Sequence, residues 1–215
     1  SAMGRLFEKE YCVVSELMES PERPCAFVLG GAKVSDAFLM MEAVLRSGAA
    51  DTVLTGGLVG NILLAARGEE IGTGSMDFIR RSGYESYIEK SSDLLRQYGD
   101  KILLPTDLAW VEDGARKECA VGAVPSDIGA VDIGAATAAR YAEVIESSRT
   151  VFVNGPMGVF EQSPSELGTK TVWEALGRTN AYTVIGGGDS ITATTKYRQT
   201  EHISYICTGG GALIR

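Results

Sequence analysis

Six short apolar segments recur along the chain, and each of them ends in glycine or in a turn signal. They cover residues 25–31, 52–57, 101–107, 150–156, 181–189 and 203–211. Within each segment the apolar positions are continuous rather than alternating, which is typical of parallel strands that are buried on both faces. The pattern therefore predicts six strands of a parallel sheet.

Helical patterns separate most of these segments. Between residues 34 and 47 apolar side chains recur at helical spacing, and Gly48 follows as a stop signal. Further helices are expected over residues 58–67, 75–98, 136–148 and 169–177. The alternation predicts an α/β fold, a doubly wound, Rossmann-like, mostly parallel six-stranded sheet in three αβα layers. Residues 118–132 fit less well and contain ECAVGAV as a candidate extra strand.

The chain shows neither a linker nor an internal repeat. We therefore expect residues 5–215 to form a single domain, while Ser1 to Gly4 resemble a cloning remnant. No segment approaches the roughly 20 apolar residues of a membrane helix, and no signal peptide is recognised.

Glycine is over-represented and clustered. It makes up 26 of 215 residues, about 12%, against a usual share of about 7%. The clusters fall at the carboxyl ends of predicted strands, where open α/β sheets bind ligands. A turn can use glycine for its positive φ alone, but five such turns favour one shared ligand crevice. The glycines concerned are Gly30, Gly31, Gly56, Gly57, Gly155, Gly186, Gly187, Gly188, Gly209, Gly210 and Gly211.

Charge and cysteine content exclude several classes of partner. A net charge of -8 and a pI near 4.8 argue against nucleic acid or an anionic membrane as the main partner, because both need clustered Lys and Arg. The four cysteines are scattered and His202 is the single histidine, so a zinc site is not expected. Reduced thiols in a cytoplasmic protein are the simpler interpretation.

Bare backbone at a helix start presents unpaired N–H groups and the positive end of the helix dipole, which suits phosphate. The chain has no Gly-Lys dipeptide, so it carries no P-loop, and no G-x-G-x-x-G follows the first strand. An acidic residue that would hold a dinucleotide's ribose is also missing at the end of the second strand.

Asp189 follows the glycines of GGGDS, where a carboxylate would repel phosphate. Mg²⁺ resolves this conflict, because it is usually bound by one or two carboxylates together with substrate phosphates. The alternative is that Asp189 caps a helix that begins near Ser190.

Five motifs in this order resemble the carboxyl-terminal, nucleotide-binding domain of phosphoglycerate kinase. They are AFVLGGAKVSD (26–36), VLTGGLVGN (53–61), VFVNGPMGVFE (151–161), IGGGDS (185–190) and TGGGA (208–212). The resemblance covers nearly the whole chain after residue 20, and the TGGL form is similar to the archaeal branch. It implies one half of a two-domain cytoplasmic kinase that moves a phosphoryl group between 1,3-bisphosphoglycerate and Mg-ADP, giving 3-phosphoglycerate and ATP.

The resemblance also implies roles for individual residues. Asp189 would meet the nucleotide's metal, Glu161 the ribose hydroxyls, and Lys33 the phosphates, although Lys33 also fits a surface lysine. The phosphate loop would be Gly187, Gly188 and Ser190. Asn154 and Pro156 would line the same nucleotide site. Positions beside adenine and ribose would be Gly30, Gly31, Gly56, Gly57 and, as a weaker match, Val131. The turn facing the transferring phosphoryl group would be Gly209, Gly210 and Gly211.

Three features depart from the family pattern. Many members carry a second lysine where this chain has Ala37, and losing such a cation can cost about 2 to 4 kcal/mol. The family's amino-terminal half, which binds the phosphoglycerate, is not in this sequence, and the segment that usually follows TGGGA is also missing. We therefore expect this chain to bind ADP or ATP but not to turn over alone.

Two other functions compete with this one. A nicotinamide-binding Rossmann domain would bind NADH more tightly than ADP, but its fingerprint is missing. The second competing function is that of a non-catalytic homologue that has kept the fold, and Ala37 is the feature that favours it.

Overall fold

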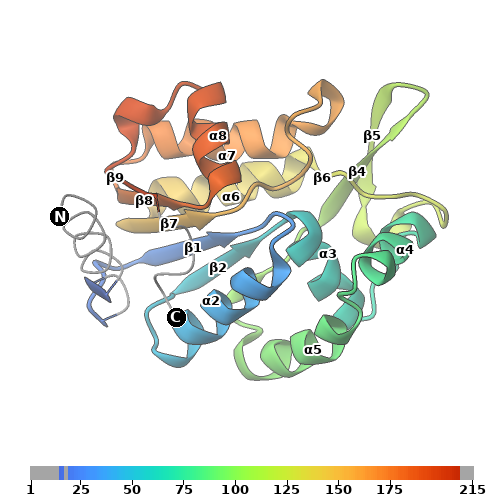
Figure 1. Ribbon diagram of the computed structural model, residues 1–215, viewed down its shortest axis with the longest axis horizontal. Helices are drawn as coiled ribbons and strands as arrows, with labels where there is room; N and C mark the ends of the chain where they lie inside the picture. Colours follow the sequence, from blue (N-terminus) through green and yellow to red (C-terminus); the bar gives the residue numbers. More distant parts are fainter. Residues whose placement is uncertain (1–14, 17–18, 209–215) are drawn as a thin grey trace.

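The computed structural model describes residues 15–16 and 19–208, and its centre is a six-stranded sheet in the order β3-β2-β1-β7-β8-β9 (Figure 1). All five neighbouring pairs are parallel. The first described strand, β1, lies in the middle of the sheet; the next strands build outward to β3, and the chain then crosses back to β7, so the doubly wound fold is confirmed. The strands are β1 (Cys25–Leu29), β2 (Thr52–Thr55), β3 (Ile102–Leu103), β7 (Thr150–Asn154), β8 (Tyr182–Gly186) and β9 (Tyr205–Cys207).

Helices cover both faces of this sheet and complete the three layers (Figure 1). On one face lie α2 (Val34–Arg46), α3 (Gly57–Ala66), α4 (Thr73–Arg81) and α5 (Ser86–Tyr98), and on the other α6 (Ala135–Ser147), α7 (Leu167–Arg178) and α8 (Gly188–Lys196). The described chain also has three single-turn 3-10 helices, η1 (Val121–Ala123), η2 (Ser163–Ser165) and η3 (Thr200–His202). None of the helices in the described ranges is long and apolar enough to cross a membrane.

Strand β1 shows why the apolar segments are continuous. Phe27 packs into the core shared with α2 and α3, whereas its neighbour Val28 packs into the core shared with α6 and α7. Both side chains are fully buried, because successive residues of a strand point to opposite faces and both faces are covered.

Two of the predicted boundaries are wrong. The helix expected over residues 75–98 is two helices, α4 and α5. The break comes at Gly83, which adopts φ 81 and whose N–H donates a hydrogen bond to Arg80 O at 3.0 Å, so that α4 ends there. The segment 101–107 forms only the two-residue strand β3, and Asp107 already belongs to a second sheet.

That second sheet is antiparallel, has the order β5-β4-β6, and was not predicted. It consists of β4 (Asp107–Glu112), β5 (Ala115–Ala120) and β6 (Asp132–Ile133). The candidate strand 118–124 is half correct, because β5 ends at Ala120 and η1 follows. Most of β5 is exposed, so it lacks the continuous apolar run that identified the other strands. The hairpin of β4 and β5 stands beside the ends of α6 and α7 (Figure 1).

Candidate functional site

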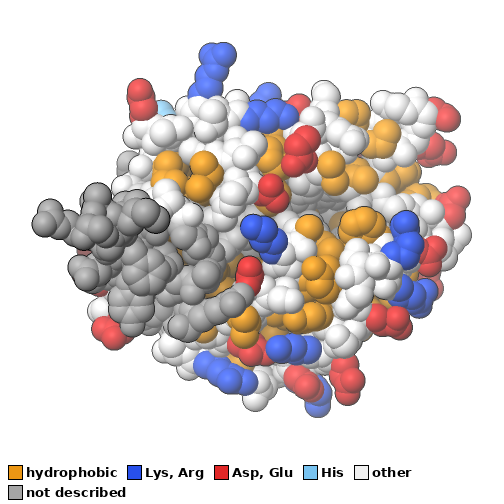
Figure 2. Space-filling model, viewed as in Figure 1, with side chains coloured by type: hydrophobic (Ala, Val, Ile, Leu, Met, Phe, Trp, Pro, Cys, Tyr) orange, Lys and Arg blue, Asp and Glu red, His pale blue; other side chains and the backbone are white. Residues whose placement is uncertain are grey.

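A cleft lies where the carboxyl ends of the central strands meet. It has a wide part of about 340 Å³ and a narrow part of about 20 Å³, and both are lined by Gly31, Ala32, Pro156 and Asp189. The space-filling view shows the molecule hollowed here, with hydrophobic side chains beside the hollow (Figure 2). Because the two parts share these lining residues, a single elongated ligand can occupy both.

The narrow part is lined mainly by backbone at the start of α8. Gly187 precedes the helix with φ 91, and no side chain caps this end, so the first amides of α8 are left for a ligand. A Cβ on Gly187 would lie 2.8 Å from Asn154 Oδ1, so glycine is needed there for packing as well as for conformation. A Cβ on Gly188 would meet nothing within 4 Å, so packing does not explain this glycine.

Asp189 and Ser190 occupy the first turn of α8 and differ in exposure. Asp189 is exposed, and no hydrogen bond or ion pair joins its carboxylate to the rest of the described chain. It lies inside the helix rather than at the capping position, which is Gly187, so the alternative that Asp189 caps the helix is wrong. Ser190 is buried, and its Oγ accepts a hydrogen bond from Gly155 N at 2.7 Å. Its hydroxyl therefore fixes the turn after β7, while its backbone borders the narrow part.

Lys33 lies directly before α2, is exposed and lines the narrow part. One turn further on, Ala37 is 4% exposed and packs in the core beneath α2. Ala37, where the family resemblance implies a second lysine, is therefore a packing position here, and Lys33 is the cation that borders this end of the described cleft.

The paired glycines after β1 and β2 let three strand ends approach closely. A Cβ on Gly30 would overlap the carbonyl oxygen of Pro156, and one on Gly56 would overlap the Met157 side chain. Gly57 N donates to Met157 O at 3.0 Å across the same junction. Gly31 and Gly57 line the wide part, whereas Gly56 lines neither part, and the close approach of Met157 explains why it is glycine.

Side chains and apolar surface line the wide part. Val131 and Glu161, both singled out in the sequence, lie here, and the Glu161 carboxylate is exposed without a partner among the described residues. Sequence reasoning missed Phe78 and Arg81 of α4, although Phe78 is 50% exposed at the cleft. The sequence signal was an apolar residue in an amphipathic helix, which does not tell a core position from an open one.

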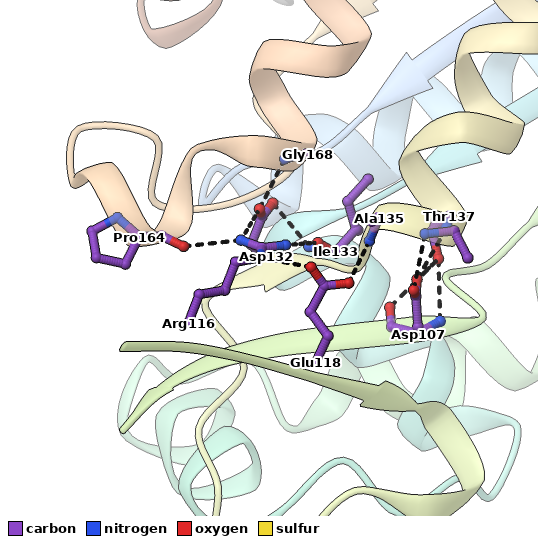
Figure 3. Close-up of polar contacts among 10 residues, drawn as sticks. Asp107, Arg116, Glu118, Asp132, Ile133, Ala135, Thr137, Pro164 and Gly168 are labelled. Carbon is purple, nitrogen blue, oxygen red and sulfur yellow. Dashed lines mark hydrogen bonds and ion pairs between the residues drawn. The ribbon is translucent and has the colours of Figure 1, made fainter. Parts of the chain in front are cut away.

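A polar network supports the wall of the wide part (Figure 3). The Arg116 guanidinium donates to Asp132 Oδ2 at 2.9 Å, and Asp132 also accepts from Gly168 N at 2.9 Å. Burial raises the pKa of Asp132 from its ordinary 3.8 to about 6, although these hydrogen bonds oppose the shift. The Asp107 carboxylate accepts from Ala136 N and Thr137 N, both at 3.0 Å, and so caps α6.

No group of three or more His, Cys, Asp or Glu side chains is arranged for a metal ion within the ranges 15–16 and 19–208. A cation at Asp189 would therefore need phosphate and water as its other ligands, as is usual for Mg²⁺. The predicted residues Gly209, Gly210 and Gly211 lie outside the described residues.

Comparisons with known proteins agree on one family. The sequence profile described as phosphoglycerate kinase matches residues 1–215. The phosphoglycerate kinase of Methanothermobacter thermautotrophicus is 41% identical over 214 residues, which cover 100% of this chain and 52% of that protein. The phosphoglycerate kinase of Thermococcus kodakarensis is 38% identical over 216 residues, which cover 99% of this chain and 52% of that protein. The chain thus spans about half the length of the curated relatives it matches.

Solved structures give the same result. The crystal structure of phosphoglycerate kinase from Pyrococcus horikoshii matches with a TM-score of 0.88 and 37% identity, covering 96% of this chain and 52% of that one. The structure of phosphoglycerate kinase from Coxiella burnetii matches with a TM-score of 0.82 and 28% identity, covering 94% of this chain and 52% of that one.

Proposed function

The chain belongs to the phosphoglycerate kinase family and corresponds to its carboxyl-terminal domain, and from this premise we propose that it binds ADP and ATP. The observation that carries the proposal is the two-part cleft, in which an apolar hollow continues into a narrow one at the uncapped start of α8. A nucleotide has the same two parts, a flat apolar base and a chain of anionic phosphates.

In this proposal the base and ribose occupy the wide part. Gly31 and Gly57 leave flat backbone surface against the base, and Val131, which also lines the wide part, adds apolar contact. The exposed carboxylate of Glu161 would accept hydrogen bonds from the ribose hydroxyls. Glu161→Gln should then weaken binding of ADP more than binding of its 2',3'-dideoxy analogue, and equal losses would refute this role.

The phosphates occupy the narrow part. The amides at the start of α8 and the helix dipole attract anions, and Lys33, which also lines the narrow part, supplies positive charge. Asp189 and the phosphates would together bind Mg²⁺, which neutralises phosphate charge when present. Asn154 and Gly187 keep the strand ends in place beneath them.

The reaction proposed for the whole protein is phosphoryl transfer between 1,3-bisphosphoglycerate and Mg-ADP. Such transfer depends on positioning and charge neutralisation, and its acceptor here is a carboxylate or a phosphate, so the chain needs no general base. Gly209, Gly210 and Gly211 are proposed to face the transferring group. The phosphoglycerate would bind to the other half of the protein, and the reaction would take place in the cytoplasm. This chain alone should therefore bind nucleotide without turning over substrate.

Calorimetric titration with ADP, with and without Mg²⁺, tests the proposal. We expect a Kd in the micromolar to millimolar range, strengthened by Mg²⁺. Asp189→Asn should remove the strengthening, because the amide lacks the charge that attracts the cation. Asp100→Asn changes an exposed acid outside the cleft and should keep the wild-type Mg²⁺ response. Absence of ADP binding, or tighter binding of NADH, would refute the proposal.

A non-catalytic nucleotide-binding homologue is the second candidate, and the buried Ala37 is the observation that favours it. A coupled kinase assay of the two-domain parent decides between the two, since turnover excludes a non-catalytic protein. Calorimetry alone does not, because both candidates bind ADP.

A further inference from the structure

Arg116 makes more side-chain hydrogen bonds than any other arginine of the described chain, although it lies on a hairpin away from the central sheet. Its Nε donates to Glu118 at 2.8 Å, Nη1 to Asp132 and to Pro164 O at 2.9 Å each, and Nη2 to Ile133 O at 2.9 Å. Figure 3 shows the guanidinium at the centre of these contacts. Its side chain is only 16% exposed, so the arrangement is shielded from water.

The partners of Arg116 belong to the two segments that form one wall of the wide part. Asp132 and Ile133 come from β6 and line the cleft directly. Pro164 belongs to η2, which follows the cleft-lining residues 156–159 and Glu161. One guanidinium therefore ties both segments from behind, outside the space a ligand would occupy.

The two segments are also in direct contact with each other. Val159 N donates to Val131 O at 2.8 Å, and a Cβ on Gly158 would lie 2.7 Å from Asp132 Oδ1. A shift of the Asp132 carboxylate would therefore move the Gly158 backbone and, through it, the segment that carries Glu161.

Desolvation offsets much of the stability that the buried pair of Arg116 and Asp132 could contribute. The Asp132 side chain is fully buried, and burial raises the pKa of its carboxyl group, so the ionised form is disfavoured in the folded protein. In some proteins a buried ion pair fixes one arrangement of the elements around it. The elements fixed here are the walls of the cleft.

We propose that Arg116 is a positioning residue that sets the width of the wide part by holding β6 against the segment from Gly158 to Pro164. The proposal rests on the proposed function, since it assumes that this cleft receives the nucleotide's base and ribose. Without the guanidinium, β6 and the Glu161 segment separate, and contacts to base and ribose weaken. The narrow part, which is built on the ends of β1, β7 and β8 and the starts of α2 and α8, keeps its geometry.

The test compares Arg116→Met with Arg178→Met. Arg178 also pairs with a carboxylate, Glu146 at 2.6 Å between α7 and α6, but this pair is exposed and lies outside the cleft. ADP affinity and thermal unfolding are measured for both variants and for the wild type, at a temperature where each is folded. We expect Arg116→Met to weaken ADP binding about tenfold, as a displaced wall would, and Arg178→Met to leave it unchanged.

Each outcome bears on the proposal. A lower melting temperature with wild-type ADP affinity would reduce Arg116 to a structural role and overturn the inference. Wild-type protein that does not bind ADP would overturn the proposed function and, with it, the inference. If Arg116→Met does not fold, Asp132→Asn, which keeps the shape and removes the charge, is measured in the same way and should weaken ADP binding in the same direction.

Discussion

The wide and the narrow part of the cleft differ in the groups that line them. The narrow part is lined mainly by glycine backbone at strand ends and at the start of α8. In the wide part, side chains from α3, α4, β6 and the segment after β7 are added to the glycine backbone. Backbone amides attract charge, and apolar side chains remove surface from water. The two parts should therefore respond to different substitutions and discriminate between different portions of a ligand.

Gly188→Ala should have the largest effect, and it is confined to the narrow part. The added methyl group meets no protein atom within 4 Å, and alanine suits a helix, so the unfolding free energy should stay equal or rise by up to about 1 kcal/mol. The same methyl group would stand between the amides of α8 and a phosphate. We expect ADP affinity to fall about 100-fold, or about 2.7 kcal/mol, by calorimetry.

Gly122→Ala is the matched control, because a Cβ there also meets nothing within 4 Å and the residue lies outside the cleft. It should leave ADP affinity unchanged. If Gly188→Ala bound ADP within twofold of the wild type, the narrow part would not be the phosphate site, and the distinction between the two parts would fail.

The second largest effect concerns the wall of the wide part and depends on pH. The pKa of Asp132 is about 6 in the folded protein and 3.8 ordinarily. Between pH 3.8 and about pH 6 the folded state therefore binds more protons than the unfolded state. The stability that this proton contributes is therefore present at low pH and is lost as the pH rises through about 6. Arg116 and, beyond it, Glu118 face this carboxyl group, and Tyr197 is close enough for the Asp132 charge to help raise its pKa.

Chemical denaturation at pH 4.5 and pH 7 measures this loss. We expect the wild type to lose about 2 kcal/mol more than Asp132→Asn between these pH values, because the asparagine does not titrate. Equal losses in the two proteins would show that Asp132 has an ordinary pKa and that the wall contains no costly buried charge.

The sequence identified most of the narrow part in advance. A site made of backbone requires glycine, and glycine is visible in a sequence, so Gly187 and Gly188 were recognised together with the strands that position them, whereas Asn154 was found only through the family resemblance. The six-stranded sheet was predictable for a related reason, since burial on both faces requires uninterrupted apolar runs such as residues 25–29.

The wide part was largely hidden from sequence reasoning. Strand β5 is mostly exposed, so neither its pairing with β4 nor the place of Arg116 could be inferred from apolar patterning. Val131 was found only through the family resemblance. Phe78 lies on an amphipathic helix, and which positions of such a helix stay uncovered depends on tertiary packing that local periodicity does not encode.

Phe78→Ala should have the smallest of these effects and tests the wide part alone. Phe78 is 50% exposed at the rim of the cleft, so its removal leaves the core intact and takes away apolar contact from a bound base. We expect ADP affinity to fall about fivefold, or about 1 kcal/mol, while affinity for inorganic pyrophosphate stays the same. Leu39→Ala is the control, because Leu39 is 44% exposed on α2 and does not line the cleft. Equal weakening of ADP and pyrophosphate binding would mean that base and phosphates do not bind in separate parts of the cleft. A loss of affinity for ADP alone would place the base in the wide part.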